Sequence, residues 1–418
     1  MSGPRSRGRL RVLVLGHTAE LGGAELALVR LCEALRQDAS GAGLDVQVVL
    51  LADGPLVTLL EGTGTPVRVV GADPELVTAG RATLASLSRA SLRRASAAAR
   101  TVVALRRVVR TVRPDVVHTT TLKADVLGLV AAWTSRVPVV WHVHDRVAPD
   151  YLPPAVVRVL RSAARHGPRA VVANSRATAA TLPGVRDLTV AYPGFAPGQA
   201  LAALPPAQAA ARSGRPRVVG LLGRVSPTKG QLELVRAAPA VLARHPDVVF
   251  RLVGAPAFGA GGYARDVEAE VRRLGLEGRV ELAGFAPDPA AALDALALCV
   301  HASPVPEPFG QVVVEAMVRG VPVVATDAGG VPEILRADGS PLGSLVPPGD
   351  PRALADAIIA VLDDPRAAHE VAVRAHAVAL ERFSVAVTAA TVSAVWRRAA
   401  RRGRAPRRPP VPARPRTA

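Results

Sequence analysis

Two glutamates, Glu307 and Glu315, stand in the most distinctive segment of the sequence, Pro306–Met317. Glu307 precedes a proline, which favours an extended backbone, and Pro308 suits the first position of a helix. The free backbone amides at the start of that helix favour an anion, and Glu315 lies about 10 Å further along its axis. Because carboxylates accept hydrogen bonds from sugar or ribose hydroxyls, the segment is a candidate ligand site. A surface acid and an unrelated acid on the helix face are the alternative.

Two cations, Arg224 and Lys229, follow a short apolar run in the segment Gly223–Gly230. The segment differs from a phosphate-binding P-loop, since no glycine precedes Lys229 and Gly230 takes the place of the Ser or Thr. Two cations at the end of a strand could neutralise a diphosphate without a metal ion. Two solvated surface cations are the alternative.

Glycines and histidines mark a second candidate surface in the first half of the chain. Gly22 and Gly23 precede an expected helix, where glycine permits close approach of a phosphate, although a tight turn has the same pattern. Three histidines at expected strand ends could act as acid, base or hydroxyl anchor, or could be structural; they are His118, His142 and His144. The sequence has no Asp-x-Asp triplet and no Gly-x-Ser-x-Gly motif, and we expect no metal ion.

The composition is that of a folded protein. The chain has 418 residues, of which 49% are hydrophobic, so two or three domains with buried cores are expected. No run reaches the ~18 apolar residues of a membrane span, and the stretch Val12–Leu15 is too short for a secretory signal. Cys32 and Cys299 form neither a disulfide framework nor a zinc motif. These features predict a cytoplasmic location.

The net charge of +18 is concentrated in two segments. Residues 76–114 and residues 397–418 each contain nine arginines and no Asp or Glu. Aromatic residues make up only 3% of the chain, so the arginines lack the stacking partners of a single-stranded nucleic-acid site. Nucleic acid is therefore not the expected partner, whereas helices over residues 84–113 could lie on an anionic membrane surface.

Apolar runs alternate with helical patterns in two stretches of the chain, which is typical of parallel βαβ units. Helices are expected over 24–35 and 231–242, and strands over 10–15, 46–51, 67–70, 115–118, 138–143, 170–173, 188–191, 218–222, 248–253, 280–282, 299–301 and 322–325. The predicted fold is α/β, with two Rossmann-like domains facing a central cleft. The predicted parts are a first domain over 1–200, a linker over 201–216, a second domain over 217–380, a helix over 381–396 that crosses back to the first domain, and a basic disordered tail over 397–418.

Taken in order, these motifs resemble the family 4 glycosyltransferases, also called glycosyl transferases group 1, over residues 10–396. The most specific parts are Glu307-Pro-Phe-Gly-x4-Glu315-Ala-Met-x2-Gly320-x-Pro322-Val-Val-Ala and Gly223-Arg-x4-Lys229-Gly. The resemblance implies the GT-B architecture and a hexosyl transfer from a UDP- or GDP-linked sugar that retains the anomeric configuration. It implies no metal ion and no cofactor besides the nucleotide-sugar substrate.

The resemblance also implies a role for each candidate residue. Arg224 and Lys229 would hold the donor diphosphate and stabilise its charge as it leaves. Glu307 would bind hydroxyls of the donor sugar, and Glu315 would bind the ribose. The remaining donor contacts would come from Gly23 at the phosphate, from the segment that lines the nucleobase, Gly284 and Phe285, and from the backbone of Phe309, Gly310 and Gln311.

The acceptor side of the reaction is less well marked. The family often has His-x-His where this chain has His118-Thr119-Thr120. His118 and His144 are therefore both candidates for the histidine at the reacting centre. The expected partners are a nucleotide sugar and a sugar or lipid-linked acceptor.

Three functions stay open from the sequence. The first is a retaining glycosyltransferase in the synthesis of cell-envelope polysaccharide or glycolipid, located in the cytoplasm or peripherally on the inner face of the membrane. The second is a basic protein that binds an anionic surface. The third is a sugar epimerase of the same fold, and binding of a nucleoside diphosphate would separate the second from the other two.

Overall fold

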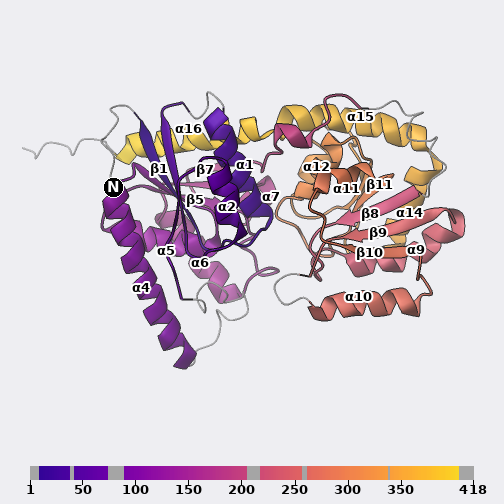
Figure 1. The fold of residues 1–418 in the computed structure, drawn as a ribbon, viewed down its shortest axis with the longest axis horizontal. Helices are drawn as coiled ribbons and strands as arrows, with labels where there is room; N and C mark the ends of the chain where they lie inside the picture. The colour runs from indigo at the N-terminus through magenta and orange to yellow at the C-terminus, as the bar shows by residue number, and fades with distance from the viewer. Residues whose placement is uncertain are drawn as a thin grey trace, which may run out of the picture.

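The computed structural model describes residues 9–37, 42–73, 89–204, 217–256, 261–337 and 339–403. These residues form two α/β lobes, each built on one sheet, and the lobes lie side by side (Figure 1). The first sheet has the strand order β3-β2-β1-β4-β5-β6-β7, and the second has the order β10-β9-β8-β11-β12-β13. Neighbouring strands pair in parallel in both sheets. The prediction of two Rossmann-like halves is confirmed.

The first lobe carries most of its helices between successive strands. Its elements are β1 (Leu10–Gly16), α1 (Gly23–Gln37), β2 (Leu44–Leu50), α2 (Pro55–Gly62), β3 (Val67–Val69), α4 (Arg89–Val112), β4 (Val116–Thr119), α5 (Leu122–Trp133), β5 (Val139–Val143), α6 (Pro154–His166), β6 (Ala170–Ala173), α7 (Arg176–Ala180), β7 (Leu188–Val190) and the short 3-10 helix η3 (Pro197–Gln199).

The second lobe repeats this alternation. Its elements are β8 (Arg217–Leu222), α9 (Gln231–Arg244), β9 (Val248–Val253), α10 (Gly261–Arg273), β10 (Val280–Gly284), α11 (Pro289–Asp294), β11 (Leu298–His301), α12 (Gln311–Val318), β12 (Val323–Thr326), α13 (Val331–Leu335), β13 (Ser344–Val346), α14 (Pro351–Asp363) and α15 (Pro365–Arg382). The three residues of β13 are too few to give an apolar run that the sequence alone identifies.

The strand order creates a topological switch point in each sheet. In the first sheet β1 has β2 on one side and β4 on the other, and in the second sheet β8 lies between β9 and β11. Ligands of open α/β sheets bind beyond the carboxyl ends of the strands at such a point. The segments after β8 and β11, and those after β1 and β4, are therefore placed where the candidate residues can meet a ligand.

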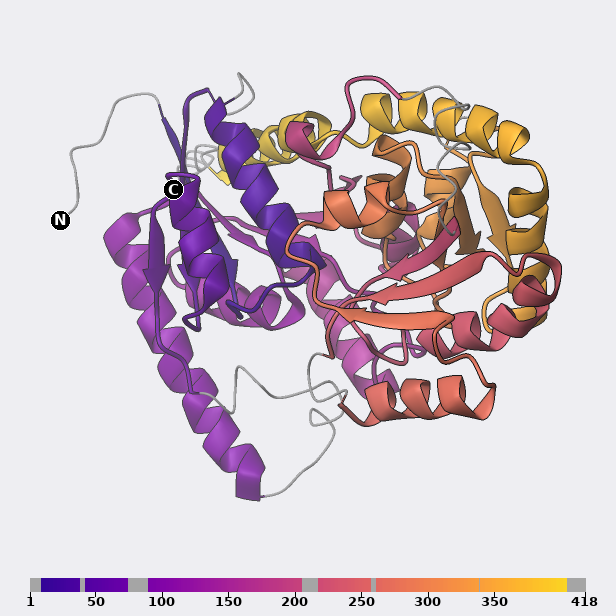
Figure 2. The same cartoon turned by 45° about the vertical axis from the view of Figure 1, so that its right-hand side comes forward.

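The last helix, α16 (Val385–Gly403), crosses back and packs on the first lobe (Figures 1 and 2). The prediction that it ends at residue 396 is wrong, because residues 397–403 continue the helix. The reason is packing, since Ala399 and Ala400 are buried with Trp396 in the core of the first lobe. Residues 404–418 of the expected tail lie outside the described residues, as do residues 205–216 of the expected linker and residues 84–88 before α4.

Two further expectations concern the whole chain. Among the described residues, none of the helices has the length and apolar character needed to cross a membrane. Both cysteines, Cys32 and Cys299, are free and buried. Burial raises the pKa of each thiol to about 12.

Candidate functional site

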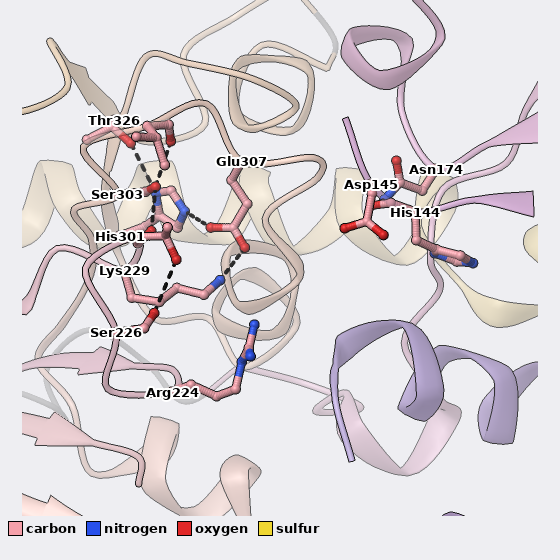
Figure 3. A network of polar contacts seen from close by, with 12 residues as sticks. His144, Asp145, Asn174, Arg224, Ser226, Lys229, His301, Ser303, Glu307 and Thr326 are labelled. Carbon is pink, nitrogen blue, oxygen red and sulfur yellow. Dashed lines mark hydrogen bonds and ion pairs between the residues drawn. The ribbon is translucent and has the colours of Figure 1, made fainter. Parts of the chain in front are cut away.

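A buried polar network lies at the switch point of the second lobe, and its centre is Glu307 (Figure 3). The Lys229 ammonium donates a hydrogen bond to one carboxylate oxygen of Glu307, and the Nε2 atom of His301 lies 2.6 Å from the other. The Nδ1 atom of His301 lies 3.2 Å from the Thr326 hydroxyl. The structure therefore brings together the predicted residues Lys229 and Glu307, and it adds His301.

The network has its shape because the backbone after β8 passes very close to the end of β11. Lys229 is followed by Gly230, which has a positive φ of 80°. A Cβ atom at Gly230 would lie 1.9 Å from the carbonyl oxygen of Ala302, one residue beyond β11. Only glycine allows this approach, and the approach brings Lys229 to the segment that carries Glu307.

Glu307 is held in its ionised form. Its side chain is only 16% exposed, and burial by itself raises the pKa of a carboxyl. The Lys229 ammonium and the hydrogen bond with His301 outweigh burial and hold the pKa of Glu307 well below its usual range. Glu307 therefore accepts hydrogen bonds and is not a proton donor at neutral pH.

Arg224 adds a second cation to this side of the junction between the lobes. Its side chain is exposed, and Figure 3 shows it extending toward the space beside Lys229 and Glu307. It also acts on Glu25 at the start of α1. Burial and the nearby Asp145 raise the pKa of Glu25, and the charge of Arg224 opposes that shift.

Two helix starts meet at the same junction. Helix α1 begins at Gly23 in the first lobe, and α12 begins at Gln311 in the second, directly after Gly310. A Cβ atom at Gly23 would lie 3.5 Å from the side-chain oxygen of Gln311. The first backbone amides of a helix have no partner within the helix and attract anions. The predicted contributions of Gly23, Gly310 and Gln311 thus share one place in the structure.

Glu315 lies one turn into α12, where both lobes contact its carboxylate. It accepts hydrogen bonds from Gln311 at 3.0 Å and, from the first lobe, from Arg30 and Gln199 at 3.4 Å each. Arg30 is only 8% exposed, so this is a largely desolvated ion pair between α1 and α12. Arg30 was not among the residues predicted from the sequence, although a charged residue between Val29 and Leu31 in a packed helix is a recognisable signal.

The other predicted donor contacts have different degrees of access. Phe285, which follows β10, is 71% exposed, so its ring is free to pack against a flat ligand. The side chain of Phe309 is buried and stacks on Tyr192 with ring centroids 5.6 Å apart. The side chain of Phe309 is therefore not available to a ligand, and the contact of its backbone with the donor stays a prediction.

The two candidate histidines differ sharply in their surroundings. His118 has no exposed surface, and its Nδ1 atom accepts a hydrogen bond of 3.1 Å from the Trp396 indole. Burial lowers its pKa to about 3. The expectation that His118 faces the reacting centre is wrong, because α16 covers it. His144 is only partly buried and lies beside Asp145 and Asn174, opposite Glu307; Figure 3 shows the Asp145 carboxylate directed toward Glu307 and the His144 ring directed away from it.

His144 is partly buried and neutral. Its ring lies 4.1 Å from the ring of His142, between centroids. Burial lowers the pKa of His144 to about 4, although Asp145 acts in the opposite direction. A neutral imidazole can both donate and accept a hydrogen bond, so His144 can anchor a hydroxyl group.

His17, which follows β1, is another residue that the sequence analysis missed. Its Nδ1 atom lies 2.8 Å from the hydroxyl of Thr121, the N-cap of α5. Burial and the nearby Lys123 lower its pKa to about 4. The position of His17 and His301 at or just beyond strand ends is the same signal that identified the other histidines.

Within the described residues, no group of three or more His, Cys, Asp or Glu side chains could hold a metal ion.

Comparison with known proteins gives matches over both lobes. Residues 21–199 match the family described as Glycosyltransferase Family 4, and residues 216–364 match the one described as Glycosyl transferases group 1. The structure is similar to that of HepE from Anabaena in complex with UDP and glucose, with a TM-score of 0.75 and 30% identity over 93% of this chain and 99% of that chain. HepE has also been crystallised with UDP-glucose.

Curated relatives match over a shorter length. The D-inositol 3-phosphate glycosyltransferase of Corynebacterium glutamicum (strain R) is 35% identical over 43% of this chain and 43% of that protein. The phosphatidyl-myo-inositol mannosyltransferase of Mycobacterium tuberculosis (strain H37Rv) is 37% identical over 46% of this chain and 50% of that protein. The chain thus spans about half the length, or less, of these curated relatives.

Proposed function

The chain belongs to glycosyltransferase family 4, and from that membership we propose that it transfers a hexose from a nucleotide-sugar donor to an acceptor at the junction of its two lobes. The observation that carries the proposal is the ionised Glu307, held by Lys229 and His301 beside the starts of α1 and α12. An acceptor of hydroxyl hydrogen bonds and a site for an anion are what a sugar diphosphate requires.

The donor would lie with its diphosphate between the two helix starts. Arg224, Lys229 and the free amides of α12 would bind the phosphate oxygens. The transition state of glycosyl transfer resembles an oxocarbenium ion, and the leaving diphosphate gains negative charge. Fixed positive charges aimed at that group stabilise the transition state more than the bound substrate.

Glu307 would act on the sugar and not as a nucleophile. Both of its carboxylate oxygens already have partners, Lys229 on one and His301 on the other. Those contacts fix the carboxylate as an acceptor of sugar hydroxyl hydrogen bonds. We propose retention of the anomeric configuration and a reaction without a metal ion, in keeping with the family resemblance of the motifs.

The donor nucleotide is proposed to be UDP-linked, since the similar HepE structure contains UDP-glucose. The acceptor is proposed to be a sugar or a lipid-linked polyol, because curated relatives are named for inositol phosphate and phosphatidylinositol substrates. It would approach from the first lobe, where Asp145 points toward Glu307 and His144 and Asn174 lie beside Asp145.

Calorimetric titration with UDP, GDP and ADP in the presence of EDTA tests the donor site. Saturable binding of one nucleotide at one site is the expected result, and it would identify the donor class. Absence of binding by all three would refute the proposed donor site. Binding that disappears in EDTA would refute the metal-independent mechanism.

We also propose that the first lobe contacts an anionic membrane through α4 and α5. Three apolar side chains on one face of α5 are exposed, Val126, Val130 and Trp133, and Trp133 is 73% exposed. The side chain of Arg106 on α4 donates to the carbonyl oxygen of Val130 at 3.5 Å, which places a cation beside this stripe. Exposed apolar residues next to arginines suit the interface of anionic lipid.

Vesicle sedimentation tests this contact at two salt concentrations. Binding to vesicles with anionic lipid should exceed binding to neutral vesicles and should weaken as salt is added. Trp133→Ala should reduce binding to the anionic vesicles relative to the wild type, while UDP binding stays unchanged. Equal sedimentation with neutral and anionic vesicles would count against the contact.

A further inference from the structure

A set of hydrogen bonds joins the first lobe to the segment that carries Glu307. The Ser175 hydroxyl donates to the carbonyl oxygen of Pro308 at 2.6 Å, and the backbone amides of Arg176 and Ala177 donate to the carboxylate of Glu333 at 2.9 and 2.6 Å. Residues 175–177 form the start of α7 in the first lobe, whereas Pro308 and Glu333 belong to the second. We refer to these bonds as the α7 contact.

The α7 contact is partly buried: Ser175 lies in the interior, whereas Glu333 and Pro308 are half-buried. Ser175 has no exposed surface, and its hydroxyl also accepts a hydrogen bond from the Thr178 amide at 2.9 Å. The Tyr192 hydroxyl donates to the same Glu333 carboxylate at 3.0 Å. Burial and the Glu333 charge raise the pKa of Tyr192 to about 12. The Glu333 carboxylate thus accepts hydrogen bonds from three donors of the first lobe.

On the other side, Glu333 is rigidly connected to Glu307. The amide of Gly330, at the start of α13, donates to the carbonyl oxygen of Glu307 at 2.9 Å. A Cβ atom at Gly329 would lie 2.0 Å from that oxygen, and Gly329 has a positive φ of 66°. The segment before Glu333 therefore packs directly on the backbone of Glu307, with no room for a side chain between them.

These contacts form a closed path from Glu307 through Gly330 and Glu333 to α7, and back through Ser175 to Pro308. If the lobes separate, the carbonyl of Pro308 loses its partners in the first lobe and the Glu333 carboxylate loses three donors. Water would replace these partners in separated lobes, and because a hydrogen bond within the protein is modestly more favourable than one to water, the arrangement favours the joined lobes. The residue that depends on it most directly is Glu307, the neighbour of Pro308.

We propose that Glu333 and Ser175 are positioning residues for the transfer reaction: docking of α7 on Pro308 and Glu333 fixes Glu307 in its reactive place only when the two lobes are joined. The proposal rests on the proposed function, since it assigns Glu307 to the donor sugar. It assigns no contact between Glu333 and the substrate. It follows that Glu307 reaches its reactive position, and the donor site is complete, only when the two lobes are joined.

The test compares Glu333→Gln and Ser175→Ala with Glu370→Gln as the control. Glu370 lies on α15 in the same lobe, and its side chain is 59% exposed in a surface ion pair. Three quantities are measured on the full chain: hydrogen–deuterium exchange at the amides of residues 176 and 177, UDP affinity, and turnover with a sugar donor. Thermal melting confirms that each variant is folded.

In Glu333→Gln, exchange at residues 176 and 177 should accelerate about tenfold or more, because the amides lose a charged acceptor. Turnover should fall about 10- to 100-fold, as expected for a displaced reactive group. UDP affinity should change less than about threefold, since the phosphate and nucleobase contacts are elsewhere. Ser175→Ala should lower turnover in the same direction, and Glu370→Gln should match the wild type in all three measurements.

Wild-type exchange together with wild-type turnover in Glu333→Gln would overturn the proposal. So would a loss of turnover that parallels a loss of UDP affinity or that Glu370→Gln shares. Failure of the proposed function gives a different result, because the unaltered chain would then bind none of UDP, GDP and ADP. In that case the exchange rates would still report whether the α7 contact joins the lobes.

Discussion

Replacement of Lys229 by alanine removes the cation that both pairs with Glu307 and faces the expected diphosphate. Loss of one fixed donor to a developing negative charge costs about 3–4 kcal/mol of transition-state stabilisation, or about 100- to 1,000-fold in turnover. We expect a decrease of this size in Lys229→Ala. The decrease should be in turnover more than in the affinity for the acceptor, because Lys229 lies in the second lobe.

The same substitution should destabilise the protein moderately. Breaking a fully buried ion pair costs about 3–5 kcal/mol, but the side chains of Lys229 and Glu307 are 21% and 16% exposed. Glu307 also keeps its contact with His301. We therefore expect a loss of about 1–3 kcal/mol in the free energy of unfolding, which leaves the protein folded at 25 °C if its stability is typical of single domains.

The assay measures turnover by release of the nucleoside diphosphate, and denaturant unfolding measures stability. Arg366→Ala is the matched control, since Arg366 also pairs with a glutamate, but at a side-chain exposure of 89% on α15. It should change neither turnover nor stability measurably. Turnover of Lys229→Ala within about threefold of the wild type, in a folded protein, would refute the role assigned to Lys229.

Three further predictions concern other parts of the structure. Phe285→Ala should weaken UDP binding about tenfold, by roughly 1–2 kcal/mol, without a change in melting temperature, and an unchanged affinity would remove Phe285 from the nucleobase site. Gly23→Val should weaken UDP binding while the fold survives, because the space at Gly23 is open apart from Gln311 at 3.5 Å; calorimetry that shows wild-type affinity would contradict a phosphate there. His118→Asn keeps an acceptor for the Trp396 indole but removes a base whose folded pKa of about 3 lies below its unfolded value of 6.5. The unfolded chain binds the proton first, so His118 costs stability as the pH falls below 6.5. The variant should therefore lose about 2 kcal/mol less than the wild type between pH 7 and pH 5, and parallel unfolding curves for the two proteins would refute this.

The sequence was sufficient to predict most strands and the general place of the donor site. The runs at β1 and β8 are short, apolar and followed by glycine, and their pattern depends on burial alone. Lys229 and Glu307 were identified because Lys229 lies in a segment bounded by glycines, which permit unusual backbone conformations, and Glu307 lies between two prolines, which restrict the backbone. Such local conformational preferences act over a few residues, so they are visible in the sequence.

Contacts between distant segments were not predictable in this way. Arg30 and Glu315 are 285 positions apart, and no local pattern in α1 or α12 indicates that they pair. The same holds for Glu333 and the amides of α7, which are more than 150 positions apart. Both contacts depend on how the two lobes join.

The sequence by itself determined which residue types stand at the strand ends and helix starts, since apolar periodicity, glycine and proline act locally. Tertiary structure alone decided which of these residues share a site. His118 lies at the end of β4 and His144 directly follows β5, yet α16 covers His118 completely through Trp396, whereas His144 stays partly exposed. The difference arises because one side chain of a helix from the far end of the chain, Trp396, packs directly on the ring of His118.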